Sequence, residues 1–228
     1  MFLTKIDLAP ERRLARKYLG SPQIMHAVVM GATGGHEGNG PGRVLWRVDR
    51  GVTTALYILS PLEPDCSQLV AEAGAAGTQA RTLDYSPLLT SLDAGQLWAF
   101  RLAANPSYST SKGPGVRGQR YGHVTVEQQR QWLIERTPRL GFELMPVDHA
   151  DGEGTDEAVL VAHRERPVFN RRRPGGGGYD RVTINRTVYE GVMRITDPES
   201  LCRALVTGIG KSKAYGCGLM TLARVQQV

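Results

Sequence analysis

The alternation of apolar and polar side chains over residues 2–8 predicts a half-buried strand at the start of the chain. A helix is expected to follow, because Ser21 can cap its first turn and Pro22 suits the first helical position, just ahead of Gln23. The pattern then predicts a hairpin of two strands, a second helix and a further strand, at residues 44–48, 53–59, 66–76 and 96–103. This order, β-α-β-β-α-β, is typical of the ferredoxin-like arrangement.

The second half of the chain repeats this alternation of helices and strands. Its pattern predicts helices at residues 127–136 and after Asp197, and strands at 142–147, 158–164, 182–184, 188–195 and 219–222. Between the halves, residues 105–122 are polar and contain several glycines and serines, which predicts an exposed linker or binding loop. We therefore expect an α+β protein with domains at residues 1–106 and 125–228, joined by a loop at 107–124.

The charged residues point to a partner, because the chain is basic and its basic residues are mostly arginine. It has 228 residues and a net charge of +6, and 23 of its 28 lysines and arginines are arginine. Arginine grips phosphate in two places and stacks on bases, so this bias fits a polyanionic partner. A GC-rich genome is the alternative explanation, since it also favours arginine.

Cysteine usage and apolar run lengths narrow the class of protein. The three cysteines show no CxxC spacing, so neither a disulfide framework nor a zinc module is indicated, and no metal is expected. The first residues are too few and too charged for the apolar part of a signal peptide, and no apolar run approaches the ~20 residues that span a bilayer. We therefore expect a soluble, cytoplasmic protein with no membrane partner and no small-molecule cofactor.

His26 is the strongest catalytic candidate from its position. On a helix that begins near Gln23 the apolar residues form one arc, and His26 lies roughly 60° beyond the edge of that arc. An imidazole between core and solvent can reach a ligand and titrate near neutral pH. The alternative is a histidine on the helix flank with no role. The sequence contains neither HExxH nor GxSxG, the motifs of zinc and serine hydrolases.

Basic residues cluster at several places along the chain. Arg171, Arg172 and Arg173 precede a run of glycines and then Arg181, as expected of a hairpin that enters a nucleic-acid groove. A disordered basic loop is the alternative. Two further clusters, one before the first helix and one in the linker, contain Arg12, Arg13 and Arg16, and Lys112, Arg117 and Arg120. Such a distribution favours an extended surface that follows a phosphate backbone.

Residues 208–218 hold four glycines with Lys211, Ser212 and Lys213 between them. The exposed N–H groups of such a loop could bind an anion, and a plain turn between a helix and a strand is the alternative. The loop follows a helix and precedes a strand, the reverse of a dinucleotide fingerprint, and Leu205 stands where a Walker A loop needs glycine. This order argues against a nucleotide-binding enzyme.

Motifs along nearly the full length resemble the CasE family, the type I-E CRISPR repeat-RNA endoribonucleases of the Cascade complex. The resemblance rests on the order and spacing of MFLTK at 1–5, MH at 25–26, FRLAANP at 100–106, WL at 132–133, VYEGVMRITDP at 188–198 and the loop at 208–218. The glycine and lysine loop is the most specific of these segments.

The resemblance implies tandem ferredoxin-like (RRM-like) domains with antiparallel sheets, and metal-independent cleavage of a CRISPR repeat at the base of its stem-loop. It implies that the ribose 2′-OH attacks the neighbouring phosphate and leaves a 2′,3′-cyclic phosphate and a 5′-hydroxyl, with His26 as general base or acid. The partners that it implies are the CRISPR repeat stem-loop RNA, as pre-crRNA and mature crRNA, and the other Cascade subunits.

Two positions depart from the family pattern. Gln23 stands where family members carry a tyrosine, three residues before His26, and glutamine can donate a hydrogen bond but cannot relay a proton. Tyr18 is a candidate substitute. Ala27 stands where an arginine often follows the histidine, so phosphate contacts are expected from the arginine hairpin and the glycine loop. These departures favour slow cleavage with retained product, and they leave open an RNA-binding subunit whose cleavage is weak or lost.

Overall fold

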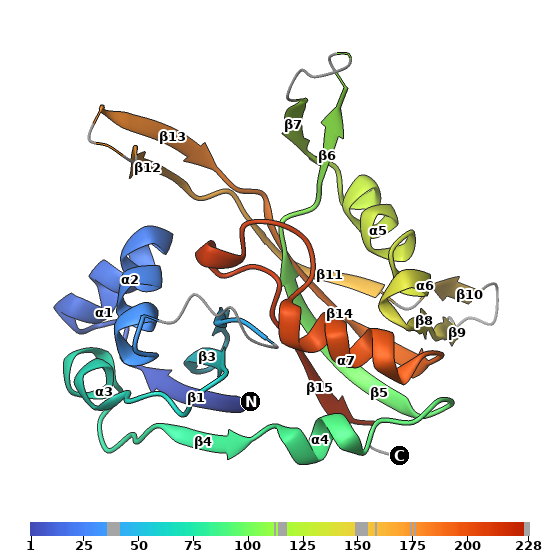
Figure 1. Cartoon of the computed structure of the whole chain (residues 1–228), viewed down its shortest axis with the longest axis horizontal. Helices are drawn as coiled ribbons and strands as arrows, with labels where there is room; N and C mark the ends of the chain where they lie inside the picture. The colour runs from blue at the N-terminus through green and yellow to red at the C-terminus, as the bar shows by residue number, and fades with distance from the viewer. Residues whose placement is uncertain are drawn as a thin grey trace.

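The computed structural model describes residues 1–35, 42–111, 113, 118–148, 155–157, 159–173, 175 and 177–225. Its two halves lie side by side, with most of the first on the left of Figure 1 and most of the second on the right. None of the helices in these ranges is long and apolar enough to cross a membrane.

The first half folds as a ferredoxin-like unit. Its elements are β1 (Phe2–Leu8), α1 (Arg13–Gly20), α2 (Pro22–Ala32), β2 (Leu45–Arg50), β3 (Thr54–Ser60), α3 (Ser67–Ala73) and β4 (Arg81–Asp84). The strands form an antiparallel sheet of order β2-β3-β1-β4. Ile6 of β1 shares a buried core with Met25 and Val29 of α2, so the apolar arc predicted for this helix faces the sheet.

The second half contains a second ferredoxin-like unit with inserted hairpins. After α4 (Ser86–Thr90) it comprises β5 (Leu97–Ala104), β6 (Ser107–Thr110), β7 (Gln119–Gly122), α5 (Val126–Ile134), α6 (Thr137–Leu140), β8 (Phe142–Leu144), β9 (Pro146–Asp148), β10 (Thr155–Glu157), β11 (Val159–Glu165), β12 (Val168–Arg172), β13 (Tyr179–Thr183), β14 (Arg186–Ile195), α7 (Pro198–Thr207), the short 3₁₀ helix η1 (Lys213–Tyr215) and β15 (Met220–Arg224). The main sheet has the order β11-β14-β5-β15, and β8 pairs with the C-terminal end of β14. With α5 after β5 and α7 after β14, the β-α-β-β-α-β order recurs. The predicted tandem ferredoxin-like fold with antiparallel sheets is therefore confirmed.

The strand predicted at residues 96–103 exists as β5, but its assignment to the first sheet is wrong. β5 pairs with β14 and β15 of the second sheet, whereas β4 lies at the edge of the first sheet beside β1. The sequence hides β4 because its four residues, RTLD, are mostly exposed and show no apolar alternation. The two sheets therefore divide between β4 and β5. A domain boundary at residue 106 stays a prediction, and this division favours an earlier one.

The segment predicted as an exposed linker, residues 107–124, includes the β6–β7 hairpin. Tyr108 stacks on Tyr121 across the hairpin, with ring centroids 5.7 Å apart, and lies 5.1 Å from the His123 ring. Cross-strand aromatic pairs stabilise a hairpin, so part of this segment forms two short strands, and its role as an exposed linker or binding loop stays a prediction. Of the basic residues predicted here to bind RNA, Lys112, Arg117 and the side chain of Arg120 lie outside the described residues.

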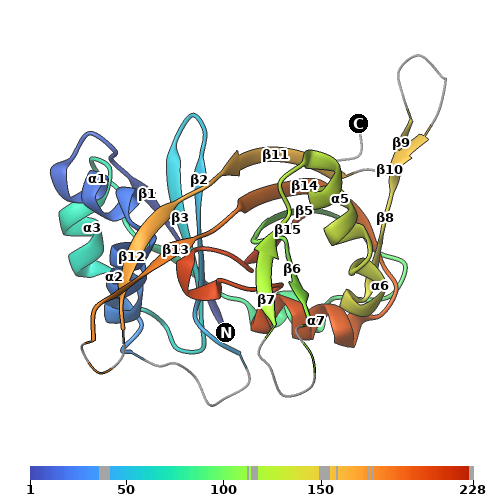
Figure 2. The same ribbon diagram turned by 90° about the horizontal axis from the view of Figure 1, so that it is seen from above.

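A buried arginine fixes the two halves against each other. Arg47 of β2 is 1% exposed, and its Nη1 donates to the carbonyl oxygens of Arg101 and Leu219 at 2.7 and 3.2 Å. Its Nε and Nη2 donate to the Asp49 carboxylate at 2.7 and 2.9 Å, so the buried charge is compensated. Figure 2 shows β2 and β3 on the side of the first half that faces the second. The hydrogen bonds that the buried Arg47 makes to the second half therefore set the relative position of the two halves.

Candidate functional site

His26 lies near the start of α2, and the local sequence explains its position. The Ser21 side chain accepts a hydrogen bond from the Ile24 N–H at 3.4 Å, and Pro22 occupies the first turn, so the helix begins where the sequence predicts. Met25 is buried against the first sheet, whereas His26 is half-buried on the flank of the helix. The predicted place of this imidazole, between core and solvent, is confirmed.

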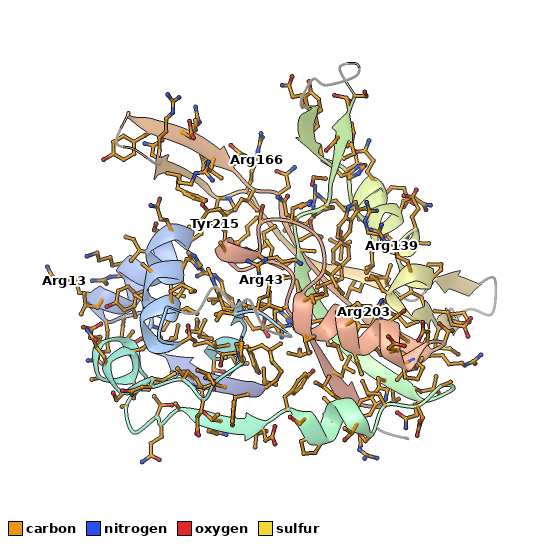
Figure 3. The ribbon with its side chains drawn as sticks, viewed as in Figure 1. Arg13, Arg43, Arg139, Arg166, Arg203 and Tyr215 are labelled. Carbon is orange, nitrogen blue, oxygen red and sulfur yellow. The ribbon has the colours of Figure 1, made fainter. Side chains whose placement is uncertain are left out.

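The His26 ring meets Tyr215, a residue from the other end of the chain. The two ring centroids lie 6.3 Å apart with their planes at 69°, an edge-to-face contact. Phe169 of β12 makes a second edge-to-face contact with Tyr215, at 4.8 Å. Helix α2, the β12–β13 hairpin and the loop around η1 therefore meet at one place, near the label of Tyr215 in Figure 3. We call this place the three-way junction.

The glycine loop delivers Tyr215 to the three-way junction. Gly216 has a φ of 75°, and a Cβ at this position would lie 2.6 Å from the Trp46 ring of β2. The N–H of Gly218 donates to the carbonyl oxygen of Ala103 at 2.6 Å. The loop is thus a fixed crossing from α7 to β15 that packs on the first half, and Figure 1 shows it lying between the halves.

Two of the three polar residues predicted to bind an anion in this loop make structural hydrogen bonds. Ser212 Oγ accepts from Asn105 Nδ2 at 2.8 Å, and Lys213 Nζ donates to the carbonyl oxygen of Thr207 at 2.6 Å. Burial, and then neighbouring positive groups, lowers the pKa of Lys213. Lys211 is exposed. Phosphate contacts of these residues stay predictions, and the exposed Lys211 is the best placed to make one.

The arginine hairpin is paired and docked on the three-way junction. β12 pairs with β13, which brings Arg171 opposite Asp180. The Asp180 carboxylate accepts from Arg173 Nε at 2.7 Å and from Arg171 Nη2 at 3.4 Å, and both hydrogen bonds lower its pKa. The hydrogen bond to Asp180, and then the interaction with Tyr215, raise the pKa of Arg171. A disordered loop is therefore the wrong alternative for the paired strands.

The basic cluster before the first helix has a different setting. Arg12 donates to two carbonyl oxygens at the end of α3, at 2.5 and 2.9 Å, and so supports that helix. Figure 3 shows Arg13 pointing outward at the far edge of the first half, well away from Tyr215. Arg16 of the same helix is exposed. RNA contacts of this cluster stay predictions, and the structure gives Arg12 a structural role.

The two remaining predicted arginines belong to the hairpin. Arg181 is exposed on β13, one residue after Asp180. The side chain of Arg172 lies outside the described residues. Arg171, Arg173 and Arg181 are therefore the hairpin arginines whose exposure the structure describes.

Comparison with known proteins identifies the family. The family model described as CRISPR associated protein matches residues 1–224. The chain belongs to this family of CRISPR associated proteins. The CRISPR-associated endoribonuclease Cse3 of Thermus thermophilus is 30% identical over 226 residues, which cover 98% of this chain and 100% of that protein. Since Cse3 is a CasE protein, the predicted membership of the CasE family is confirmed.

Solved structures of CasE proteins share the fold of the chain. A structure of the CRISPR endoribonuclease Cse3 bound to 19 nt RNA is 28% identical with a TM-score of 0.78, and the match covers 98% of this chain and 100% of that one. The CRISPR-associated protein Cas6e of Escherichia coli is 20% identical with a TM-score of 0.59, over 99% of this chain and 100% of that one. The second likeness supports the fold alone.

The two residues considered in place of the CasE tyrosine, Gln23 and Tyr18, have different settings. Gln23 lies one turn before His26 on α2, so the two side chains are neighbours on the helix surface. The Tyr18 hydroxyl donates to Glu72 of α3, which raises the pKa of Tyr18 to about 12, and its ring is part of the first core. A catalytic role of Tyr18 stays a prediction, and the structure gives this hydroxyl a structural role, because it holds α1 to α3.

Tyr215 and Asn105 are site residues that the sequence patterns do not single out. Tyr215 is the only aromatic residue in the sequence of the glycine loop, and this was the one feature of the sequence that could have pointed to it. Asn105 joins the loop to the base of the arginine hairpin, because it donates to Ser212 and its Oδ1 accepts from the Asn185 N–H at 3.2 Å. The contact of Tyr215 with His26 depends on how the two halves pack, and no local pattern predicts that.

Proposed function

We propose that this chain is a metal-independent endoribonuclease that binds the stem-loop of a CRISPR repeat and cleaves pre-crRNA. The 2′-OH beside the scissile phosphate is the nucleophile, and the products end in a 2′,3′-cyclic phosphate and a 5′-hydroxyl. The enzyme stays bound to the crRNA as a Cascade subunit. The observation that carries this proposal is the junction of His26 with Tyr215 and the arginine hairpin, in a chain whose relative is named an endoribonuclease.

This reaction needs proton transfer, orientation and charge stabilisation from the protein, because RNA supplies its own nucleophile. His26 transfers a proton as general base or acid, a role that typically contributes about 10²–10⁴-fold. The Arg171 guanidinium, which the hairpin brings beside Tyr215, stabilises negative charge on the phosphate during attack. The groups for all three tasks come from the three-way junction.

The arginine hairpin binds the RNA. One carboxylate, Asp180, orients two guanidiniums, so a positive charge remains on the hairpin, and the exposed Arg181 adds to it. Phosphate contacts fix the position and orientation of a nucleic acid on a protein. Because this part of the affinity does not depend on the scissile bond, the cleaved stem-loop stays bound and turnover is slow.

A second candidate function is an RNA-binding subunit of the same assembly with weak or lost cleavage. Gln23 favours it, because this side chain cannot relay a proton as the tyrosine of the CasE pattern could. Ala27 favours it as well, because it lacks the positive charge of the arginine often found there. Neither replacement removes an RNA-binding group of the hairpin.

Cleavage in EDTA separates the two functions. The full chain, in excess over its cognate repeat RNA, is incubated in EDTA, and the products are resolved on a denaturing gel. The proposal predicts one cut at the base of the stem-loop, abolished by a 2′-deoxy substitution at the nucleotide before the scissile phosphate. Tight binding without product supports the second function. Cleavage only after addition of metal, or cleavage of the 2′-deoxy RNA, contradicts the proposed mechanism.

A further inference from the structure

We propose that the Tyr215 hydroxyl donates a hydrogen bond to a non-bridging oxygen of the scissile phosphate, which makes Tyr215 a second catalytic residue beside His26. This inference rests on the proposed endoribonuclease function. Tyr215 belongs to the second half of the chain, whereas the proton-transfer group, His26, belongs to the first half.

The position of the Tyr215 ring is the first argument. The ring makes edge-to-face contacts with the His26 imidazole and with Phe169 of the arginine hairpin. The ring centroids lie 6.3 and 4.8 Å apart, respectively. A phosphate within reach of His26 and of the hairpin guanidiniums must therefore pass close to Tyr215.

The direction of the hydroxyl proton is the second argument. Arg171 lies two residues after Phe169 on β12, so it shares the strand face that meets the Tyr215 ring, and its interaction with Tyr215 raises the pKa of Arg171. A guanidinium has donors but no acceptor, so the tyrosine proton must point away from Arg171. A hydroxyl whose oxygen faces a positive charge is polarised and becomes a stronger donor. A phosphate oxygen, which is an anionic acceptor, suits such a hydroxyl.

The rigidity of the loop is the third argument, because a donor stabilises a transition state best when it is already in place. The Arg186 Nη2 donates to the carbonyl oxygen of Tyr215 at 2.5 Å, and Arg186 is itself paired with Glu165. The N–H of Tyr215 donates to the carbonyl oxygen of Ser212 at 2.9 Å. Gly216 follows directly and packs against the Trp46 ring. Contacts on both sides therefore hold the Tyr215 backbone.

Other hydroxyl and ammonium groups near these elements have different partners. The Tyr18 hydroxyl is directed to Glu72, on the side of α3. The Lys213 ammonium donates to the carbonyl oxygen of Thr207 at the end of α7. Of these three residues, Tyr215 is the one that contacts the His26 imidazole.

The cleavage step needs no reactant other than the RNA and the groups that transfer its protons. The 2′-oxygen forms a bond to phosphorus and gives up its proton to a base, while the bond from phosphorus to the 5′-oxygen breaks and that oxygen takes up a proton. Negative charge on the non-bridging oxygens grows in the transition state. Tyr215 keeps its own proton throughout, and its hydrogen bond strengthens as this charge grows.

Tyr215→Phe tests the proposal, because it removes the hydroxyl and keeps the ring contacts with His26 and Phe169. We expect the single-turnover cleavage rate to fall about 10²-fold, as for other donors to a developing oxyanion. RNA affinity and melting temperature stay at the wild-type values. Tyr121→Phe, which removes an exposed tyrosine hydroxyl from the β6–β7 hairpin, is the matched control and leaves the rate unchanged. A Tyr215→Phe enzyme that cleaves as fast as the Tyr121→Phe control overturns the proposal.

Phosphorothioate RNA separates contact with the phosphate from an indirect effect on His26. Sulfur accepts hydrogen bonds poorly, so we expect wild-type enzyme to cleave one of the two diastereomers of a non-bridging substitution much more slowly than the other. Tyr215→Phe should cleave both at similar rates. A variant that keeps the wild-type preference shows that Tyr215 does not contact the phosphate. Failure of the proposed function is seen separately, as wild-type protein that does not cleave unmodified RNA in EDTA.

Discussion

The two halves of the molecule share one fold but contribute different parts of the candidate site. In the first half, His26 lies on α2, a helix that belongs to the ferredoxin-like pattern itself. In the second half, Arg171 and Tyr215 lie on additions to that pattern, the β12–β13 hairpin and the loop around η1. Both additions contact α2. A repeated fold thus supplies the scaffold, whereas the site depends on the segments in which the repeats differ.

This division requires that the halves hold a fixed relative position. Arg47 of the first half donates to the carbonyl oxygen of Arg101 in β5 and to that of Leu219, which directly precedes β15. Trp46, its neighbour on β2, packs against the glycine loop. The strand that joins the halves is therefore also the support of the loop that carries Tyr215. A change at the interface between the halves should therefore also move Tyr215, because both depend on β2.

Replacing His26 removes the contribution of the first half and has the largest expected effect. His26→Ala should lower the single-turnover cleavage rate by about 10²–10⁴-fold, because proton transfer is lost. RNA affinity in a filter-binding assay stays unchanged, since the hairpin guanidiniums remain. His163→Ala, at an exposed position on β11, is the control and changes neither quantity. Wild-type cleavage by His26→Ala would place the chemistry outside α2.

Displacing the glycine loop breaks the connection between the halves and has the next largest effect. In Gly216→Ala the new Cβ meets the Trp46 ring, and a φ of 75° costs about 1–2 kcal/mol for a residue with a side chain. Tyr215 then shifts, and a shift of about 1 Å can cost about 10²-fold in rate. Single-turnover cleavage and urea unfolding measure the two effects.

Gly77→Ala is the matched control for this loop variant. Gly77 has a φ of 71° but nothing within 4 Å of a Cβ, so it shares the backbone strain without the collision. It should lose stability and keep the wild-type cleavage rate. If both variants cleave alike, contact of the loop with Trp46 does not position the site.

Reversing charge on the arginine hairpin tests the RNA-binding contribution of the second half and has the smallest effect. Arg171→Glu combined with Arg173→Glu should weaken repeat RNA binding at least about 10-fold and reduce its salt dependence, because phosphate contacts are lost. The same reversal of Arg13 and Arg16 on α1 tests the predicted RNA contacts of that cluster, and we expect a smaller loss there, because Arg13 lies at the far edge of the first half, away from Tyr215. Equal losses from both pairs would show that RNA covers α1 as well as the hairpin.

Elements with local signals could be predicted from the sequence. Ser21-Pro22 and Asp197-Pro198 mark the starts of α2 and α7, and apolar alternation marks β1. The pairing partners of β5 could not be predicted, because an apolar strand carries no label for the sheet that it joins. β4 and the β6–β7 hairpin were missed, since exposed polar strands depend on pairing and on aromatic stacking across the hairpin.

The candidate site was predictable in part for the same reason. His26 could be found because its place relative to the apolar arc depends only on its own helix. Tyr18 was a plausible partner by closeness in sequence, yet its hydroxyl is bound to Glu72 on another helix. Tyr215 reaches His26 only through the packing of the two halves. Contacts between distant segments are set by the whole fold, and a single sequence does not show them.

A double-mutant cycle of His26→Ala and Tyr215→Phe tests most directly whether the site is assembled from both halves. Single-turnover cleavage rates of wild type, the two single variants and the double variant are measured with the same repeat RNA in EDTA. Residues that act as a unit give strongly non-additive losses. We therefore expect Tyr215→Phe to lower the rate about 10²-fold in the wild-type enzyme and hardly at all in the His26→Ala enzyme. The same fold-loss in both backgrounds would contradict a site shared by the two halves.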